Sequence, residues 1–207
     1  MIVDFLDILR RERLVAIVRG ADPAACAATV LTLAEAGVTL LEVSLTGVDA
    51  PAVIERAGAA TGAGVMLGAG TVMTAEQADT AAAAGAAFTV TPALGPGALR
   101  SVELGLPSLI GAFTPTEVWH AARAGAAAVK VFPAALGGPG HVRALRDPFP
   151  GIPLVPVGGV SAELAGDYLD AGAVAVGVGS PLVGDAVRGG DLGALRERAA
   201  RFLAAVR

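Results

Sequence analysis

A single lysine stands in this sequence, and its position indicates amine chemistry. All but one of the 15 Lys and Arg residues are Arg, so Lys130 is the only primary amine among the side chains. Arginine replaces lysine as a surface cation, but not where a reaction needs an amine that can lose its proton. Lys130 lies in the apolar run 128–133, where burial lowers the pKa of an amine and favours its nucleophilic form. We therefore expect Schiff-base chemistry; the alternative is a lysine that packs and pairs with a buried carboxylate.

A lone carboxylate, Glu42, lies in a second apolar run, 40–46. Alternate residues of a strand point to one face, so Leu40, Glu42 and Ser44 share the face opposite to Leu41 and its neighbours. A carboxylate among apolar residues needs a partner. We expect a structural ion pair with the lysine, a general acid/base with a raised pKa, or both together.

Arg19 follows the run 14–18 and shares its face with Val15 and Ile17. Its fork of donors suits a carboxylate or a phosphate, and the alternative is a rim arginine paired with a neighbouring acid. Two more run ends carry small or polar groups, one at Gly68-Ala69-Gly70-Thr71 and one at Thr89-Val90-Thr91-Pro92. Thr71 and Pro92 are candidate substrate contacts on this basis.

Glycine-rich turns follow the last two apolar runs. They read Gly158-Gly159-Val160-Ser161 and Gly177-Val178-Gly179-Ser180. In a (β/α)8 barrel the turns after strands seven and eight, together with helix N-termini, form the usual phosphate site. The prediction is a phosphate contact through Gly158, Gly159, Gly179 and Ser180; the alternative is a pair of tight turns.

The elements that must position these residues repeat about every 25 residues. Eight short apolar runs alternate with Ala-rich stretches of helical spacing, and four of these stretches end before Gly37, Gly85, Gly125 and Gly172. Runs buried on both faces that alternate with helices indicate a parallel sheet. Eight units predict a closed (β/α)8 barrel in a single domain, 1–207, with an open doubly wound sheet as the alternative. Residues 1–13 are expected to add a helix at the barrel bottom, and 192–206 to form the last helix. The eight runs are Leu14–Val18, Leu40–Leu45, Val65–Leu67, Phe88–Val90, Ser108–Ile110, Ala127–Phe132, Leu154–Val157 and Val174–Val178.

Composition excludes several classes of protein. The chain of 207 residues is 54% hydrophobic and 16% charged, which is too apolar for intrinsic disorder. A net charge of −4 argues against nucleic acid and anionic membranes as partners. The apolar runs are too short to span a membrane, and residues 1–13 lack the order of a signal peptide. One cysteine, Cys26, allows no intramolecular disulfide, which favours a cytoplasmic location.

The remaining special side chains predict neither a metal nor a cofactor. The two histidines, His120 and His141, fall in expected helices rather than beside clustered acids at strand ends. Gly68-Ala69-Gly70 lacks the third glycine of a dinucleotide fingerprint. Cys26, Trp119 and Tyr168 lie in expected helices and are assigned to packing.

One ordered set of motifs resembles a known family. Leu41-Glu42-Val43, Gly68-Ala69-Gly70-Thr71-Val72, Val129-Lys130-Val131-Phe132-Pro133, Val157-Gly158-Gly159-Val160 and Gly177-Val178-Gly179-Ser180 together resemble the 2-keto-3-deoxy-6-phosphogluconate (KDPG) aldolases, over about 14–183. That family includes the 6-phosphogalactonate (KDPGal) and 4-hydroxy-2-oxoglutarate aldolases.

The resemblance implies a metal-independent Schiff-base aldolase on a (β/α)8 barrel that assembles as a homotrimer. By the same resemblance Lys130 forms the imine, Glu42 is the acid/base, Thr71 contacts pyruvate and Phe132 lines the pocket. Gly159 and Ser180 then lie at the phosphate end of the substrate.

The chain departs from the family pattern at two positions. Many members carry Arg where this chain has Thr46, so we assign carboxylate binding to Arg19, which other members carry at the end of strand one. KDPG aldolases often have Thr where this chain has Val157, and Val157 with Gly138-Pro139-Gly140 is more like the phosphogalactonate members.

The sequence thus predicts an aldolase that cleaves a 2-keto-3-deoxy-6-phospho sugar acid to pyruvate and glyceraldehyde 3-phosphate. A phosphosugar isomerase or epimerase would use the same phosphate turns without an imine. A non-catalytic phosphometabolite-binding barrel would form no product, and a divalent-metal aldolase would be sensitive to chelator.

Overall fold

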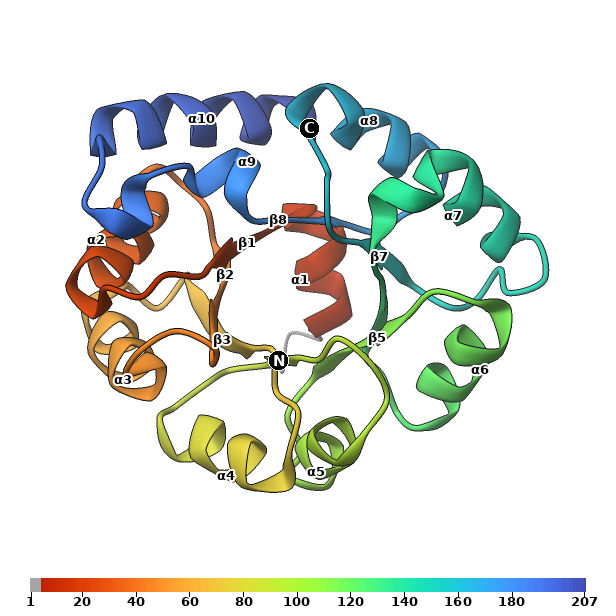
Figure 1. Ribbon diagram of the computed structural model, residues 1–207. Coiled ribbons are helices and arrows are strands. Elements are labelled where there is room, and N and C mark those ends of the chain that lie inside the picture. The colour runs from red at the N-terminus through yellow and green to blue at the C-terminus, as the bar shows by residue number, and fades with distance from the viewer. Residues whose placement is uncertain (1–4) are drawn as a thin grey trace.

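Eight parallel strands form the core of the computed structural model, which describes residues 5–207. The hydrogen-bonded order is β7-β6-β5-β4-β3-β2-β1-β8, and a parallel bridge between Val157 and Gly177 joins the two ends into a barrel. Figure 1 looks along the barrel and shows the strands as an inner ring surrounded by helices. The predicted (β/α)8 barrel is confirmed. The strands are β1 Leu14–Val18, β2 Leu40–Ser44, β3 Met66–Gly70, β4 Thr89–Val90, β5 Ser108–Ala112, β6 Ala128–Val131, β7 Leu154–Pro156 and β8 Val176–Val178.

Helices follow the strands in turn, as expected for this topology. Thr74 and Thr114 each complete a capping box, and Asp22 accepts from the amides of Ala24 and Ala25. Ser161 is also an N-cap, but its side chain makes no capping hydrogen bond. The helices are α1 Phe5–Glu12, α2 Pro23–Glu35, α3 Ala50–Ala60, α4 Ala75–Ala83, α5 Pro96–Glu103, α6 Pro115–Arg123, α7 Gly138–Arg146, α8 Ala162–Asp170, α9 Ser180–Val183 and α10 Leu192–Ala205, with 3-10 turns η1 Ala134–Leu136 and η2 Ala186–Arg188.

Two apolar layers result from the alternation of residues along each strand. Leu41, Val129 and Val131 point outward and pack against the helices. Leu40 and Ala128 point inward and belong to a second cluster inside the barrel. This parity carries Glu42 on β2 and Lys130 on β6 into the barrel, where the sequence placed them.

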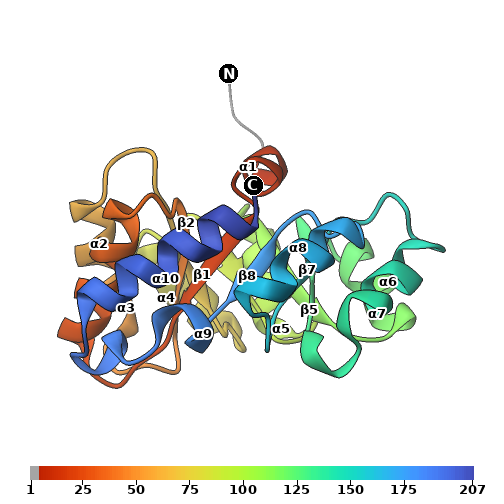
Figure 2. The same ribbon diagram turned by 90° about the horizontal axis from the view of Figure 1, so that it is seen from above.

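The helix α1 covers one end of the barrel. Figure 2 shows it above the ends of the strands, and Phe5 packs on the ring of Phe88 with 5.1 Å between ring centroids. Leu9 has no exposed surface. The expected N-terminal helix is therefore present over Phe5–Glu12, while the part of that prediction that covers 1–4 lies outside the described residues. The last helix, expected over 192–206, is α10.

In the described part of the chain, no helix has the length and apolar character needed to cross a membrane.

Candidate active site

A cavity of about 350 Å³ opens at the barrel end opposite α1, where the carboxyl ends of the strands meet. It brings together Lys130 and all eight residues predicted to bind substrate. Catalytic groups of this fold lie at this end of the barrel. The predicted residues that line the cavity are Arg19, Thr71, Pro92, Lys130, Phe132, Gly158, Gly159, Gly179 and Ser180.

Lys130 lies at the floor of this cavity and is 5% exposed. Burial lowers the pKa of its amine; the negative charge of Glu42 opposes this effect, and the positive charge of Arg19 adds to it. The Nζ atom lies 5.0 Å from the ring centroid of Phe132, which is 40% exposed at the mouth. The amine is thus available as a neutral nucleophile at lower pH than an ordinary lysine.

Glu42 is 1% exposed, and its Oε2 atom has no hydrogen-bond partner. Burial raises the pKa of this carboxyl, against the opposing positive charges of Lys130 and Arg19. A Cβ added at Gly70 would collide with Oε1, so the glycine of β3 makes the room that the carboxylate occupies. A buried carboxyl with a raised pKa and a free oxygen suits proton transfer in both directions.

The expected ion pair between Glu42 and Lys130 is wrong as a direct contact. Neither side chain takes part in an ion pair within 4.0 Å among residues 5–207. Their charges act on each other through space, as the two pKa shifts show. The two groups are therefore not in direct contact: Lys130 lines the cavity, whereas Glu42 is buried behind its lining.

Arg19 is held by hydroxyl groups rather than by an acid. Its Nε donates to Ser44 Oγ and its Nη2 to Thr71 Oγ1, both at 3.3 Å. No carboxylate lies within 4.0 Å of it in the described chain, so the alternative of a rim ion pair is wrong. Neutral partners orient the guanidinium and leave its charge available for an anion in the cavity.

Ser44 contacts two of the predicted site residues, Arg19 and Thr71, although the sequence did not single it out. It has no exposed surface, and its Oγ lies 2.9 Å from both Thr46 Oγ1 and Thr71 Oγ1 while it accepts from Arg19. Its inward parity was visible in the sequence, but the convergence of three strand ends on one hydroxyl was not. Thr71 itself has a left-handed backbone, with φ 60°, which is unusual for a β-branched residue.

The two glycine turns (Gly158–Gly159 after β7 and Gly179–Ser180 after β8) form the other side of the cavity. Gly158 and Gly159 have φ of 95° and 78°, and a Cβ at Gly159 would lie 2.6 Å from Cβ of Ala135. Both space and conformation thus require glycine at 159. Ser180 begins α9, and the first N–H groups of a helix have no partner within it.

The remaining candidates lie away from this cavity. His141 Nε2 is 2.8 Å from the Phe113 carbonyl oxygen and its ring stacks on Phe113, while His120 is exposed on α6. Cys26 and Tyr168 are buried, as their assignment to packing requires. Trp119 corrects that assignment, because it stacks on Phe149 but stays 51% exposed. Within residues 5–207, no three His, Cys, Asp or Glu side chains gather closely enough to hold a metal ion.

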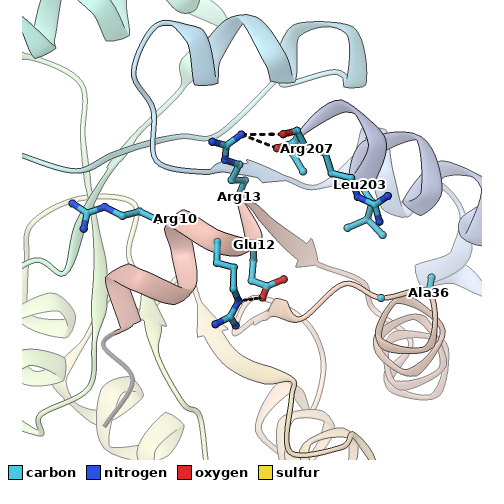
Figure 3. Close-up of a pocket in the computed structure, with 9 residues that line it drawn as sticks. Arg10, Glu12, Arg13, Ala36, Leu203 and Arg207 are labelled. Atoms are coloured by element: carbon cyan, nitrogen blue, oxygen red, sulfur yellow. Dashed lines mark hydrogen bonds and ion pairs between the residues drawn. The ribbon is translucent and has the colours of Figure 1, made fainter. Parts of the chain in front are cut away.

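A larger cavity of about 480 Å³ lies at the opposite end of the barrel, between α1 and α10 (Figure 3). Arg13 Nη1 donates to the carbonyl oxygens of Val206 and Arg207, both at 3.3 Å. Arg10 points away from Arg13 rather than toward a shared centre (Figure 3). This cavity therefore lacks the convergent groups of a reaction site despite its size.

Known proteins place the chain in a family. The family described as KDPG and KHG aldolase matches residues 5–197. The chain is 38% identical to the probable 2-dehydro-3-deoxy-6-phosphogalactonate aldolase of Rhizobium meliloti (strain 1021), over 93% of this chain and 90% of that protein. It is 34% identical to the 2-dehydro-3-deoxy-6-phosphogalactonate aldolase of Escherichia coli (strain K12), over 82% of this chain and 83% of that protein. The solved structure of native KDPGal superposes with a TM-score of 0.86 at 34% identity, over 93% of each chain.

Proposed function

The chain belongs to the KDPG and KHG aldolase family, and we propose that it cleaves a 2-keto-3-deoxy-6-phospho sugar acid through an imine on Lys130. The products are pyruvate and glyceraldehyde 3-phosphate. The observation that carries the proposal is the lone lysine, buried with a lowered pKa inside the same barrel as a buried carboxyl of raised pKa. Family membership supports a carbon–carbon lyase over the isomerase and the non-catalytic barrel.

Lys130 begins the reaction. Its neutral amine attacks the C2 ketone, and the carbinolamine takes up a proton and loses water to give a protonated imine. This imine is an electron sink for the bond that breaks next. An amine with an ordinary pKa would be almost wholly protonated near neutral pH, so burial of Lys130 supplies the reactive form.

Glu42 moves the protons. As a carboxylate it takes the proton of the C4 hydroxyl, directly or through water, while the C3–C4 bond breaks and its electrons pass to the imine. Glyceraldehyde 3-phosphate leaves, and Glu42 returns the proton to C3 of the enamine. Water then hydrolyses the imine, which frees pyruvate and restores the amine. A raised pKa suits a group that must both accept and donate.

The two ends of the substrate take opposite sides of the cavity. Arg19 and Thr71 bind the carboxylate, because the guanidinium has only hydroxyl partners and keeps its charge available. The two glycine turns bind the phosphate through backbone N–H groups and the Ser180 hydroxyl. Phe132 and Pro92 border the reacting carbons. Binding at both ends aligns C2 with the amine and C4 with Glu42.

The test of this function is chemical trapping. Wild-type protein incubated with pyruvate and borohydride should gain one reduced pyruvyl adduct, located on Lys130 by peptide mass analysis. Lys130→Arg should gain none and should release no pyruvate from either phosphorylated sugar acid. An adduct of equal yield in Lys130→Arg would end the proposal, and turnover that chelator abolishes would favour the metal-dependent class.

We further propose that the galactonate epimer is the better substrate. Val157 lines the cavity without a hydroxyl, and the two relatives described above are named for phosphogalactonate.

We also propose that the active form is a homotrimer. Exposed apolar side chains, among them Trp119 and Leu136, support association of copies. Light scattering during gel filtration measures the assembly, and a monomer mass at micromolar concentration would exclude the trimer.

A further inference from the structure

The helix α9 is a single turn, and it connects the substrate cavity to the outside of the barrel. It spans Ser180–Val183; Gly179, Ser180 and Pro181 at its start line the cavity, and Leu182 and Val183 at its end are buried. One turn of helix is not stable on its own. Its position is therefore set by its surroundings, which are the core around Leu182 and Val183 and the groups that bind its end.

Arg198 on α10 binds the end of this turn. Its Nε donates to the Leu182 carbonyl oxygen at 2.7 Å, and its Nη2 donates to the Val183 carbonyl oxygen at 3.1 Å. The side chain is only 18% exposed. The last carbonyls of a helix lack partners within it, so the planar fork of Arg198 satisfies two of them at once. In Figure 1, α10 lies beside α9 on the outer side of the barrel.

The residues that follow α9 pack closely against the guanidinium of Arg198. Gly184 has φ 56°, and a Cβ there would lie 2.8 Å from Cζ of Arg198. Any larger residue at 184 would displace the arginine. Asp185 Oδ1 lies 4.0 Å from its Nη2 and adds an attractive charge. These contacts on several sides hold the Arg198 side chain in one conformation.

We propose that Arg198 is a positioning residue for the phosphate end of the substrate: it holds α9 so that Gly179 and Ser180 meet the phosphate. The inference rests on the proposed function. Arg198 touches neither substrate nor Lys130, so it should affect phosphate recognition and leave the imine chemistry intact. A small displacement of a positioned group is enough to weaken binding strongly.

The chain offers a matched control in Arg146. Its Nη1 donates to the Gly172 carbonyl oxygen at 3.1 Å, and a Cβ at Gly172, φ 99°, would lie 2.5 Å from Cδ of Arg146. This is the same arginine-on-glycine arrangement, in the loop that enters β8 at the other end of the barrel. Loss of Arg146 should cost stability without reaching the phosphate.

The experiment compares Arg198→Met, Arg198→Lys and Arg146→Met with wild type on two substrates, the phosphorylated sugar acid and the same sugar acid without phosphate. Arg198→Met should raise KM for the phosphorylated substrate about tenfold and leave kcat/KM for the unphosphorylated one within about twofold. Arg198→Lys keeps a charged donor group, so its KM for the phosphorylated substrate should lie between those of Arg198→Met and wild type. Arg146→Met should lower the melting temperature and leave the ratio of the two kcat/KM values unchanged.

The outcomes separate this inference from the proposed function. Equal losses on both substrates in Arg198→Met and in Arg198→Lys, or the same ratio change in Arg146→Met, would overturn the role of Arg198. If Arg198→Met does not fold, Arg198→Lys must still raise the phosphate-specific KM, and an unchanged ratio would overturn the proposal. Failure of wild type to form the trapped pyruvyl adduct would instead refute the aldolase mechanism.

Discussion

Glu42 and Lys130 are both buried in the barrel, yet no ion pair within 4.0 Å joins them. Burial raises the pKa of the carboxyl and lowers that of the amine, while each charge acts against the shift of the other. A direct ion pair would hold both groups in their charged forms. Without such a pair, burial lowers the pKa of the amine and leaves Oε2 of Glu42 without a hydrogen-bond partner.

The pH dependence of imine formation should report this coupling. The amine reacts when unprotonated, so the rate of borohydride-trapped adduct should rise with pH and reach its midpoint below 10.5, the ordinary pKa of lysine. In Glu42→Gln the negative charge that raises the pKa of Lys130 is gone, so the midpoint should move to lower pH. Rapid-quench trapping over a pH series measures both midpoints. A midpoint that moves upward in Glu42→Gln would contradict the coupling.

Gly70→Ala should disable Glu42 without touching Lys130. The added Cβ would occupy the place of the Glu42 carboxylate, so the acid/base group must move. We expect kcat to fall about 100-fold, the usual contribution of a general acid/base, while the trapped adduct persists. Gly58→Ala in α3 is the control, because a Cβ there meets nothing within 4 Å. Steady-state kinetics of both variants decide the matter, and wild-type kcat in Gly70→Ala would show that the carboxylate does not need its present position.

Much of the site could be predicted because strand parity and residue type both indicate which side chains point into the barrel. The inward faces of β2 and β6 followed from alternation alone, and they placed Glu42 and Lys130 in one interior. The ordinal positions of the two glycine turns then located the opposite side of the cavity. Strand ends differed by up to three residues, as at β3, which continues through Gly70 because backbone pairing with β2 does not require apolar side chains.

Contacts between elements distant in the sequence could not be predicted in this way. Ser44 was visible as an inward residue, but its meeting with Thr71 depends on how far β2 and β3 extend at the mouth. Trp119 was expected to pack because it lies in a helix, whereas α6 leaves half of its side chain exposed to solvent. Arg198 resembles any other arginine of an amphipathic helix until α9 is placed beside it.

Val157→Thr should change the preference between the two epimeric substrates. Val157 is 5% exposed and lines the cavity, so a hydroxyl there would meet the substrate rather than water. Unmatched polar groups in a closed site are costly, and we expect the ratio of kcat/KM values to shift about tenfold toward the gluconate epimer. Pyruvate release from both epimers, assayed in parallel, measures the ratio. A constant ratio would mean that C4 stereochemistry is read elsewhere.

Thr71 combines a backbone cost with a hydroxyl that the site uses, and two substitutions separate the contributions. Its φ of 60° is unfavourable for any residue with a Cβ and costs about 1 kcal/mol relative to glycine. Its Oγ1 accepts from Arg19 and lies 2.9 Å from Ser44 Oγ. Thr71→Ala keeps the backbone cost and loses the hydroxyl, whereas Thr71→Gly loses both.

The glycine variant should therefore be the more stable of the two by about 1 kcal/mol in denaturant unfolding. Both should show the same rise in KM, because both release Arg19 from one of its two hydroxyl partners and so disorder the carboxylate end. Thr71→Ser keeps the hydroxyl and should stay near wild-type KM. If KM instead followed stability across the three variants, the hydroxyl would have no role beyond folding, and carboxylate binding would rest on Arg19 and Ser44 alone.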